Sequence, residues 1–512
     1  MSMGVEAAPL RLRPGDTVAV AIEATAAGTT LVVGDLRLQA RDDIPAGHKV
    51  ALAHVATGGE VRKYGQVIGV ATQDIEPGEH VHSHNLAFAH LARDYHYGAE
   101  RREEPDPVAV ATFRGIVRPD GQVATRNYLG IITSVNCSAT VARMVAAQLQ
   151  AVLDLDEAWP SVDGVVALTH GSGCGMAGSG EGFELLRRTL SGYAAHPNFA
   201  GLLVLGLGCE VNQVRALTEG FDVPAHKPVL SMTIQEMGGT RATVRAATER
   251  LQELAQQANR VSRTEVPASK LVLGLECGGS DAYSGMTANP ALGVAADLLI
   301  DQGGTAILGE TPEIYGAEHL LAGRAASGQV GRQLIDRVRW WEDYVKTSGA
   351  SLDNNPSPGN KAGGLTTILE KSLGAVAKGG SRSLRAVYGY AERVSSPGLV
   401  FMDTPGYDPV SVTGMVAGGA NVVCFTTGRG SVFGSKPAPC IKLCTNTGTF
   451  RRMEEDMDVN CGTIIDGESS VEQVGRQIFD MVLAVASGQR TKSEQLGFGD
   501  EEFTPWQLGA VL

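Results

Sequence analysis

Short hydrophobic runs separated by turn sequences mark the amino-terminal part of the chain. Val-rich or alternating runs occur at 17–26, 29–40, 49–56 and 65–75, and the turn sequences PGD, IPAGH, TGGE and EPGE lie around them. Short runs with a two-residue period are typical of β-strands joined by tight turns. The pattern therefore predicts a small all-β module over residues 14–90.

The hydrophobic pattern changes beyond residue 113. Apolar runs at 127–135, 163–169 and 199–207 alternate with helix-like stretches at 138–155, 180–194 and 212–221. This alternation indicates parallel strands joined by crossover helices. A charged segment with two prolines, at 91–112, reads as a linker. We therefore expect an α/β protein with four parts: the β module (14–90), the linker (91–112), an α/β domain (113–265) and a carboxyl-terminal α/β domain (266–512).

Composition narrows the class of protein. The 512 residues carry 43 Lys and Arg against 56 Asp and Glu, a net charge of −13, which argues against broad electrostatic binding of nucleic acid or membrane. No apolar stretch has the length of a secretory signal or of a membrane span. We expect a cytoplasmic protein whose eight cysteines are reduced.

The positions of four cysteines suggest chemistry. Cys137, Cys174, Cys209 and Cys277 each follow an apolar, strand-like run. Ligands of α/β sheets bind at the carboxyl ends of strands. Their wide spacing matches no zinc finger or ribbon, so any metal site must combine distant segments. Buried packing of each thiol as a small hydrophobe is the alternative.

Histidines and carboxylates supply a second set of ligands and proton carriers. His80, His82 and His84 follow the EPGE turn, where strand alternation would place the three imidazoles on one face. A solvated polar loop is the alternative. The stretch GETPE places Glu310 and Glu313 together at a strand end. Several cations suit a carboxylate substrate, among them Arg126, Lys361, Arg429 and Lys442.

Two other functional classes remain open at this point. Residues 173–178 match the pattern GxGxxG after a strand, which would suit a nicotinamide-dependent oxidoreductase. The acidic residue expected about 20 positions later is missing, which weakens that hypothesis. A non-catalytic carbohydrate-binding or regulatory protein built on the β module is a third hypothesis, and it would leave the strand-end Cys and carboxylates without a role.

Several long motifs resemble one family closely. These are GHKVALA (47–53), KYGQVIGVA (63–71), GEHVHSHN (78–85), TRNYLGI (125–131), GLGCE (206–210), LECGGSDAYSGMTANPALG (275–293), NPSPGNKAGG (355–364) and TTGRG (426–430). They resemble the altronate and galactarate dehydratases over about residues 14–505. The family also includes sulfolactate sulfo-lyases, in which the small β module and the large part are separate chains.

The resemblance carries expectations for fold, cofactor and partners. It implies an amino-terminal module of the SAF, or β-clip, type and a dehydratase acting on a small sugar acid. It implies Fe(II), Mn(II) or another divalent metal as cofactor, and no NAD. It is also consistent with a homo-oligomer.

The resemblance, together with the strand-end positions, gives a set of candidate site residues. As catalytic groups we expect His48, Lys49, Tyr64, His84, Glu310 and Lys361. As substrate-binding groups we expect Arg126, Asn127, Asp281, Ser284, Asn289, Asn360 and Arg429. The metal ligands are expected to be a subset of His82, His84, Cys137, Cys174, Cys209, Glu210 and Cys277, and three or four of the cysteines could instead hold an iron–sulfur cluster.

Different motifs of the chain favour different substrates. HVHSHN (80–85) matches the altronate enzymes and differs from the galactarate enzyme, where acidic and hydroxyl residues replace the histidines. SVNCSAT (134–140) and MDVNCGTIIDGE (457–468) resemble the galactarate enzyme more, or neither. Altronate is the first expectation, followed by galactarate or another aldonate or aldarate, and then by sulfolactate.

Overall fold

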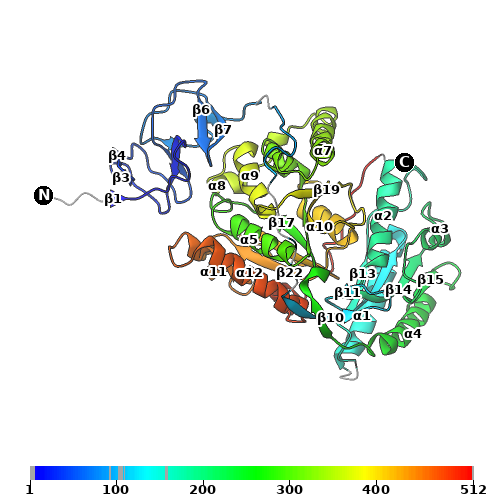
Figure 1. Ribbon diagram of the computed structural model, residues 1–512. Helices are drawn as coiled ribbons and strands as arrows, with labels where there is room; N and C mark the ends of the chain where they lie inside the picture. The colour runs from blue at the N-terminus through cyan, green and yellow to red at the C-terminus, as the bar shows by residue number, and fades with distance from the viewer. Residues whose placement is uncertain are drawn as a thin grey trace.

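The computed structural model describes residues 6–90, 94–101, 106, 108, 110–155 and 159–509. A small β module lies at one end, a large α/β domain in the middle and a second α/β domain at the other end (Figure 1). The predicted fold class is confirmed, because antiparallel strands precede two parallel sheets. Of the predicted linker, residues 91–93, 102–105, 107 and 109 lie outside the described part of the chain.

The β module consists of three small sheets with the orders β1-β3-β4, β2-β5-β8 and β6-β7-β9. Its strands are short, as the closely spaced turn sequences predict. Most residues of β2, β5 and β7 are buried, among them Val18, Val50 and Ile68. The strands are β1 (Glu6–Ala7), β2 (Val18–Val20), β3 (Thr30–Val33), β4 (Leu36–Gln39), β5 (Lys49–Ala51), β6 (Glu60–Lys63), β7 (Gln66–Ala71), β8 (His80–Val81) and β9 (Leu86–Ala87).

Residues 94–101, within the predicted linker, dock on the carboxyl-terminal domain. The Tyr95 hydroxyl donates to Glu318 at 2.8 Å, and the backbone N–H of Gly98 donates to the carbonyl of Ala322 at 2.9 Å. Both acceptors belong to helix α6 (Glu318–Gly323). The chain leaving the β module is therefore held against the large domain.

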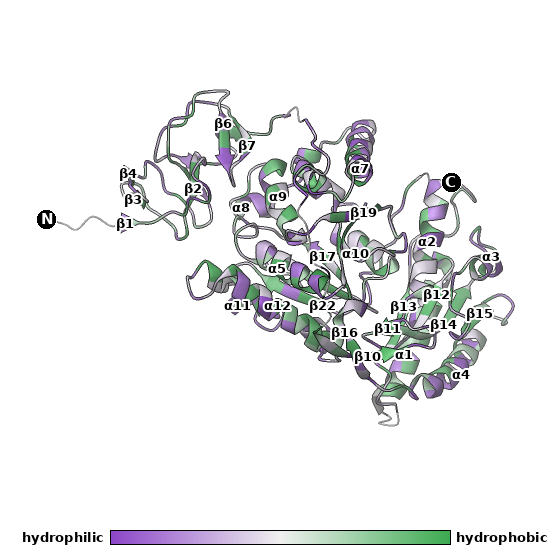
Figure 2. Ribbon diagram, viewed as in Figure 1, coloured by the Kyte–Doolittle hydropathy of each residue, from purple (hydrophilic) through white to green (hydrophobic). Residues whose placement is uncertain are grey.

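The second domain is a four-stranded parallel sheet of order β13-β12-β14-β15. Leu129 and Ile131 face one helical layer, and Tyr128 and Ile132 face another. Apolar residues concentrate in these central strands, between helices that carry polar residues (Figure 2). The strands are β12 (Tyr128–Thr133), β13 (Gly164–Leu168), β14 (Phe199–Gly206) and β15 (Val229–Thr233), and the helices are α1 (Ala139–Leu155), α2 (Glu181–Ala195), α3 (Val214–Glu219) and α4 (Thr240–Ala258).

A small antiparallel sheet links the two α/β domains. Strand β10 (Thr112–Val117) pairs with β11 (Val123–Ala124) on one side and with β16 (Thr264–Pro267) on the other. The second domain is thus closed by strands from both of its ends. The tail near the carboxyl terminus returns to it, since Phe503 stacks edge-on against Tyr193 of α2.

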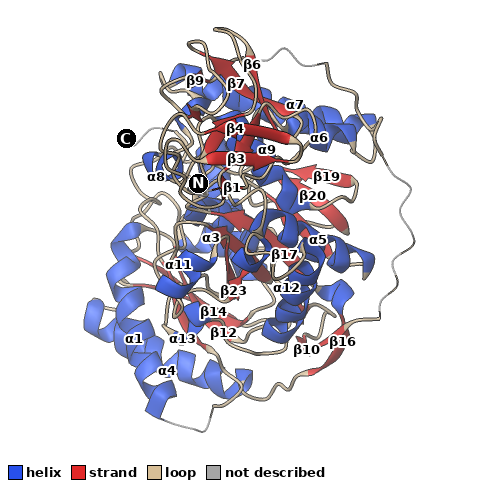
Figure 3. Cartoon of the chain, turned by 90° about the vertical axis from the view of Figure 1, so that its left-hand side faces the viewer, coloured by secondary structure: helices blue, strands red, loops and turns tan. Residues whose placement is uncertain are grey.

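The carboxyl-terminal domain is built on a seven-stranded parallel sheet of order β19-β20-β18-β17-β21-β22-β23. Helices enclose the sheet (Figure 3). The strands are β17 (Val272–Cys277), β18 (Thr305–Leu308), β19 (Leu384–Tyr388), β20 (Gly398–Met402), β21 (Val422–Thr427), β22 (Cys440–Cys444) and β23 (Val459–Asn460). The other helices are α5 (Ala288–Asp301), α7 (Gly328–Thr347), α8 (Pro358–Ala362), α9 (Ile368–Ala375), α10 (Asp408–Ala417), α11 (Thr447–Arg452), α12 (Val471–Ala486) and α13 (Lys492–Gln495).

Within the described residues, no helix is both long and apolar enough to cross a membrane.

Candidate functional site

The carboxyl ends of the central strands of the seven-stranded sheet gather a group of thiol and carboxylate side chains. Cys277 ends β17, and Glu310 follows β18. The Cys277 Sγ lies 3.3 Å from Glu310 Oε2 and 3.4 Å from Glu313 Oε2. The ligand atoms of these three residues all lie within 4.8 Å of one another, as a single metal ion requires. We call this group the thiol–carboxylate centre.

Two lysines balance part of the negative charge of the thiol–carboxylate centre. The Lys378 Nζ lies 2.8 Å from both Cys277 Sγ and Glu310 Oε2, and the Lys371 Nζ lies 2.6 Å from Glu313 Oε1. Burial raises the pKa of the Cys277 thiol well above its usual value, and the Glu310 carboxylate adds to this shift. Without a cation the thiol is therefore protonated at neutral pH.

A further carboxylate group adjoins the centre. Glu276, Glu310 and Asp408 also bring ligand atoms within 4.8 Å of one another. Burial, and then the neighbouring Glu310, raise the pKa of Glu276 well above its usual range and that of Asp408 to about 7. Asp408 is half-buried, whereas Glu276 and Glu310 are buried. The protein thus places more carboxylates here than its lysines neutralise.

A divalent cation fits this donor set. Oε1 of Glu276 and Oε1 of Glu310 are buried without a hydrogen-bond partner among the described residues. An unpaired buried carboxylate oxygen is costly, and a cation would compensate it. Oxygen donors with one thiol suit Fe(II) or Mn(II). The residues present therefore fit the divalent metal expected from the sequence.

The β module docks on the same edge of the sheet through a buried ion pair. Lys49 on β5 and Lys63 on β6 each place Nζ 2.9 Å from the Glu370 carboxylate on α9. All three side chains are at most 1% exposed. Burial opposes ionisation of Glu370, but the two ammonium groups outweigh it and hold the pKa of this carboxyl well below its usual range. Lys49, predicted as catalytic, is thus an anchor of the module.

Histidines of the β module gather where it meets helix α8. His48 and His80 share a 2.9 Å contact between Nδ1 and Nε2, and the ring centroids of His48 and His82 are 4.9 Å apart. His82 Nε2 lies 2.9 Å from the carbonyl oxygen of Lys361, and His48 Nε2 lies 3.4 Å from that of Ala362. We call the four residues His48, His80, His82 and His84 the histidine cluster.

The expected strand geometry of the histidine cluster was wrong. Strand β8 ends at Val81, and a turn carries the following residues. The rings still gather, because this turn folds back and brings the centroids of His80 and His84 to 5.3 Å. Burial, followed by the nearby basic groups, lowers the pKa of His80 and of His82 to about 4. These two imidazoles are therefore neutral at neutral pH.

The loop after β17 connects the histidine cluster with the sheet. Asp281 accepts hydrogen bonds from Ser284 and from Thr445, and the Asn360 amide donates to the carbonyl of Ser280 at 2.8 Å. Asn289 donates to the carbonyl of Gly374 at 3.0 Å. These predicted substrate-binding residues are brought close together, but their polar groups mainly hold the loop.

Three other predicted residues lie along the same edge. Arg429 follows β21, is exposed, and donates its backbone N–H to the carbonyl of Gly279 at 3.0 Å. Lys361 is half-buried on α8. Tyr64 has a left-handed backbone, φ 61°, and its ring lies 4.9 Å from the Lys63 ammonium.

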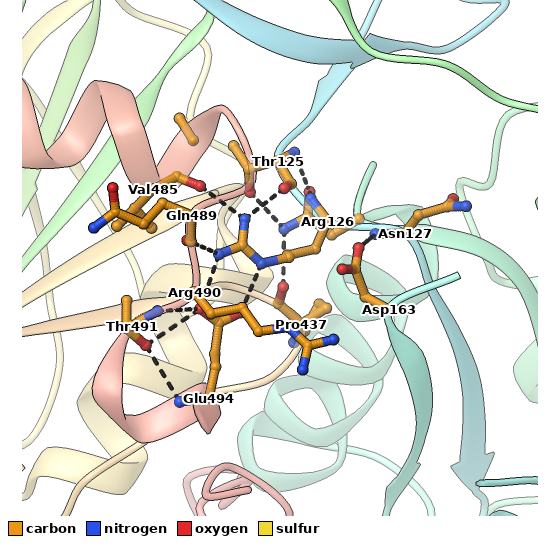
Figure 4. Close-up of polar contacts among 12 residues, drawn as sticks. Thr125, Arg126, Asn127, Asp163, Pro437, Val485, Gln489, Arg490, Thr491 and Glu494 are labelled. Atoms are coloured by element: carbon orange, nitrogen blue, oxygen red, sulfur yellow. Dashed lines mark hydrogen bonds and ion pairs between the residues drawn. The ribbon is translucent and has the colours of Figure 1, made fainter. Parts of the chain in front are cut away.

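Arg126 and Asn127 lie away from this edge. The Arg126 guanidinium donates to both carboxylate oxygens of Glu494, at 2.6 and 2.8 Å, and to the carbonyl groups of Thr125, Val485 and Gln489 (Figure 4). Arg126 is 1% exposed. The structure places this predicted substrate-binding residue at the junction of the second domain with helices α12 and α13. Asn127 donates to the carbonyls of Ser161 and Ala258 in the second domain.

The remaining predicted metal ligands lie in the other sheet. Cys137, Cys174 and Cys209 follow β12, β13 and β14 of the second domain and are exposed. Glu210 is buried there, and its carboxylate accepts from the Ser134 hydroxyl and the Gly208 N–H, each at 2.6 Å. The four strand-end cysteines are thus divided between two sheets.

Sequence reasoning missed four charged residues of the site. Glu276, Glu370, Lys371 and Lys378 are all buried. The last three stand in GLTTILEKSLGAVAKGG (364–380), an otherwise apolar and small-residue segment. Charges inside such a segment are rarely buried without partners, so this pattern was the available signal.

A cavity of about 740 Å³ lies elsewhere, between the second and the carboxyl-terminal domains. Arg187, Arg188 and Arg393 are among its lining residues, and none of the predicted site residues lines it. Among the described residues, neither of the two groups of potential metal ligands lines this cavity.

Comparison with protein-family models matches three consecutive parts of the chain. Residues 7–89 match the altronate/galactarate dehydratase SAF domain, and residues 115–259 match the second domain of D-galactarate dehydratase/altronate hydrolase. Residues 268–511 match the carboxyl-terminal domain of D-galactarate/altronate dehydratase.

Curated relatives match nearly the whole chain. An altronate dehydratase of Bacillus subtilis (strain 168) is 35% identical over 507 residues, which cover 98% of this chain and 99% of the relative. A galactarate dehydratase (L-threo-forming) of Escherichia coli (strain K12) is 38% identical over 504 residues, 96% of this chain and 95% of the relative. The beta subunit of a (2R)-sulfolactate sulfo-lyase of Chromohalobacter salexigens is 35% identical over 390 residues, 75% of this chain and 95% of that subunit.

Proposed function

The chain belongs to the altronate/galactarate dehydratase family, and because relatives that match nearly the whole chain are dehydratases, we propose that it removes water from a sugar acid to give a 2-keto-3-deoxy acid. The proposed substrate is altronate, with galactarate as the next candidate. The observation that carries this proposal is that the histidine cluster contacts helix α8, which is itself hydrogen-bonded through Asn360 to the loop that follows Cys277 of the thiol–carboxylate centre.

The reaction sets clear chemical demands. The proton at C2 is weakly acidic, so negative charge that develops on the adjacent carboxylate must be stabilised as the proton leaves. The hydroxyl at C3 then departs with a proton, and the enol that forms tautomerises to the keto acid. A divalent metal bound at the site would supply Lewis acidity toward the substrate oxygens.

Residues of the thiol–carboxylate centre would hold this metal. Cys277, Glu310 and Glu313 supply a compact ligand set, and Glu276 and Asp408 supply adjacent oxygens. Lys371 and Lys378 hydrogen-bond to the same ligands and fix their orientation. The predicted ligand Cys277 and the predicted catalytic residue Glu310 are therefore both assigned to metal binding in this proposal.

The histidine cluster would carry protons. A general base must be neutral before it accepts a proton, and His80 and His82 satisfy this condition at neutral pH. The contact between His82 Nε2 and the Lys361 carbonyl favours the tautomer with the proton on Nε2, so Nδ1, which lies 3.0 Å from the Ser83 hydroxyl, would be the accepting atom. The exposed His84 lies beside His80 and could return the proton to the leaving hydroxyl.

Cations at the rim would bind the substrate carboxylate. Arg429 is exposed beside the loop after β17, and Lys361 lies on α8 against the histidine cluster. Guanidinium and ammonium groups pair well with carboxylates. In this proposal the acid group of the substrate would lie between the β module and the sheet.

A sulfo-lyase reaction is the second candidate. A 51-residue segment is 53% identical to the alpha subunit of a (2R)-sulfolactate sulfo-lyase of Paracoccus pantotrophus. Expulsion of sulfite from C3 needs the same stabilisation of charge at the substrate carboxylate. The two reactions differ in the leaving group alone.

The experiment is a substrate screen with the full-length protein, purified anaerobically and loaded with Fe(II). Altronate, galactarate, other aldonates and aldarates, and sulfolactate are supplied separately, and keto acid and sulfite are measured. Keto acid from altronate, abolished by a chelator and restored by Fe(II), is the expected result. Sulfite from sulfolactate with no keto acid from any sugar acid would replace the dehydratase proposal by the sulfo-lyase.

A further inference from the structure

Three cysteines of the second domain lie at the ends of three adjacent strands. In the sheet, β12 lies between β13 and β14, and Thr133 pairs with Leu205. Cys137 and Cys209 lie equally far beyond these paired residues, and Cys174 follows β13 on the other side of β12. Adjacent strands are about 4.8 Å apart, so the three cysteine-bearing loops leave the sheet side by side.

Hydrogen bonds tie the three loops to one another. The backbone N–H of Asn136, next to Cys137, donates to the carbonyl of Ser172 at 3.0 Å. The backbone N–H of Asn212 donates to the carbonyl of Gly173, next to Cys174, at 3.0 Å, and its side chain donates to Ser134 at 3.1 Å. Asn136 is adjacent to Cys137, Gly173 is adjacent to Cys174, and Asn212 follows Cys209 by three residues. Each cysteine is therefore close in sequence to a hydrogen bond that joins two of the loops.

Close backbone packing also holds the loops together. A Cβ on Gly173 would lie 2.2 Å from the carbonyl oxygen of Ser134 and 2.8 Å from the Cα of Val135, and its φ of 98° disfavours other residues. Only glycine fits at this contact. The glycine in the GxGxxG match thus has a packing role that needs no dinucleotide, namely to bring the Cys174 loop against the Cys137 loop.

The exposure of the three thiols separates them from the other cysteines. Cys137, Cys174 and Cys209 are exposed, whereas the other five cysteines of the chain, which all belong to the carboxyl-terminal domain, are buried. Cysteine is among the most buried residue types, so three exposed thiols at one sheet edge call for a chemical explanation. Glu210 does not join them as a ligand, because its carboxylate is engaged by Ser134 and Gly208.

The spacing of the thiols distinguishes two kinds of metal site. Among the described residues, the ligand groups compact enough for one ion, with all atoms within 4.8 Å, contain none of these cysteines. In an iron–sulfur cluster each thiolate binds a different iron, so its cysteines stand farther apart than the ligands of a single ion. The three thiols lie on adjacent loops but are not as close together as the ligands of a single ion. This spacing fits an iron–sulfur cluster better than a single metal ion.

We propose that Cys137, Cys174 and Cys209 hold an iron–sulfur cluster at the carboxyl edge of the second-domain sheet. Such clusters are held by cysteine thiolates. With three cysteines present, one iron of a [4Fe–4S] cluster would receive no thiolate from this sheet edge and would be open to an oxygen ligand. This site is separate from the thiol–carboxylate centre and does not depend on the proposed dehydratase reaction.

The test measures the cluster directly and needs no substrate. The full-length protein is purified anaerobically and reconstituted with Fe(II) and sulfide, and iron, acid-labile sulfide, visible absorption and electron paramagnetic resonance are recorded. We expect about four irons and four labile sulfides per chain at this site, with the broad visible absorption of a cluster.

Single variants assign the ligands. Cys137→Ser, Cys174→Ser and Cys209→Ser are each expected to lose the labile sulfide and the absorption, with unchanged thermal unfolding of the unreconstituted protein, since all three thiols are exposed. Cys277→Ser is the matched control and is expected to keep the labile sulfide. Bound iron without labile sulfide, a disulfide among the three cysteines under anaerobic conditions, or full retention of sulfide in the three variants would overturn the proposal.

Loss of dehydratase activity alone would bear on the proposed function and not on the cluster.

Discussion

The Lys49 ammonium of the β module lies 2.9 Å from the Glu370 carboxylate of the carboxyl-terminal domain, with both side chains fully buried. The same carboxylate binds Lys63 at 2.9 Å. One acidic residue of helix α9 therefore anchors two strands of the module. This anchor holds the module where His48 and His82 contact the carbonyl groups of helix α8.

Replacement of Glu370 by Gln is expected to loosen the module. Removing one partner of a buried ion pair leaves a buried charge uncompensated and costs about 3–5 kcal/mol. Thermal unfolding should occur at lower temperature, and hydrogen exchange should rise in β5 and β6. Glu219→Gln is the control, because the exposed pair Arg215–Glu219 contributes about 1 kcal/mol or less. Equal effects of the two substitutions would contradict the anchoring role.

Arg126 is expected to act through stability and not through substrate binding. Its guanidinium is committed to Glu494 and to three carbonyl groups, so Arg126→Lys loses most of these bonds. The unfolding temperature should fall clearly, whereas KM for the sugar acid in the folded fraction should not change. A raised KM without loss of stability would return Arg126 to the substrate-binding residues.

Cys277→Ser is expected to weaken metal binding at the thiol–carboxylate centre. The substitution replaces a soft sulfur donor with a hydroxyl. Because changes to residues around metal ligands already lower metal affinity roughly tenfold, Fe(II) affinity should fall by at least that factor. Cys440→Ser, in a buried strand of the same sheet, is the matched control. Isothermal titration with Fe(II) under anaerobic conditions measures both. Unchanged affinity in Cys277→Ser would remove this residue from the ligand set.

Acid should destabilise the second domain through buried histidines. Burial lowers the pKa of His196 to about 3 and that of His170 to about 4. Each group is neutral in the folded protein and takes up a proton on unfolding below pH 6.5, so its contribution is complete above pH 6.5 and is lost as the pH falls toward 3–4. The slope is about 1.4 kcal/mol per pH unit for each group.

His196→Gln tests this dependence, since an amide can still donate to the Ala420 carbonyl but cannot titrate. Its unfolding temperature should fall less steeply than that of the wild type between pH 6.5 and pH 4. His54→Gln, at an exposed position, serves as the control and should follow the wild type. Parallel curves for all three proteins would show that His196 does not govern the acid response.

The sequence predicted the fold more completely than the site. Period-two runs and the strand–helix alternation predicted the β module and the parallel sheets, because these patterns report local burial. The strand ends placed Cys277 and Glu310 together for the same reason. The buried charges Glu370 and Lys378 were not predicted, because their partners come from segments far away in the chain. The sequence also did not show that Arg126 is buried against Glu494, since a buried structural arginine and a substrate-binding arginine have the same sequence signature.

The most direct test of the proposed dehydration follows its product in heavy water. The Fe(II)-loaded protein is mixed with altronate in D₂O, and the product is observed by nuclear magnetic resonance. Loss of water between C2 and C3 followed by tautomerisation predicts a 2-keto-3-deoxy acid with one deuterium at C3. Unchanged altronate, with galactarate and the other sugar acids also unchanged under the same conditions, would contradict the proposal that this chain is a metal-dependent sugar-acid dehydratase.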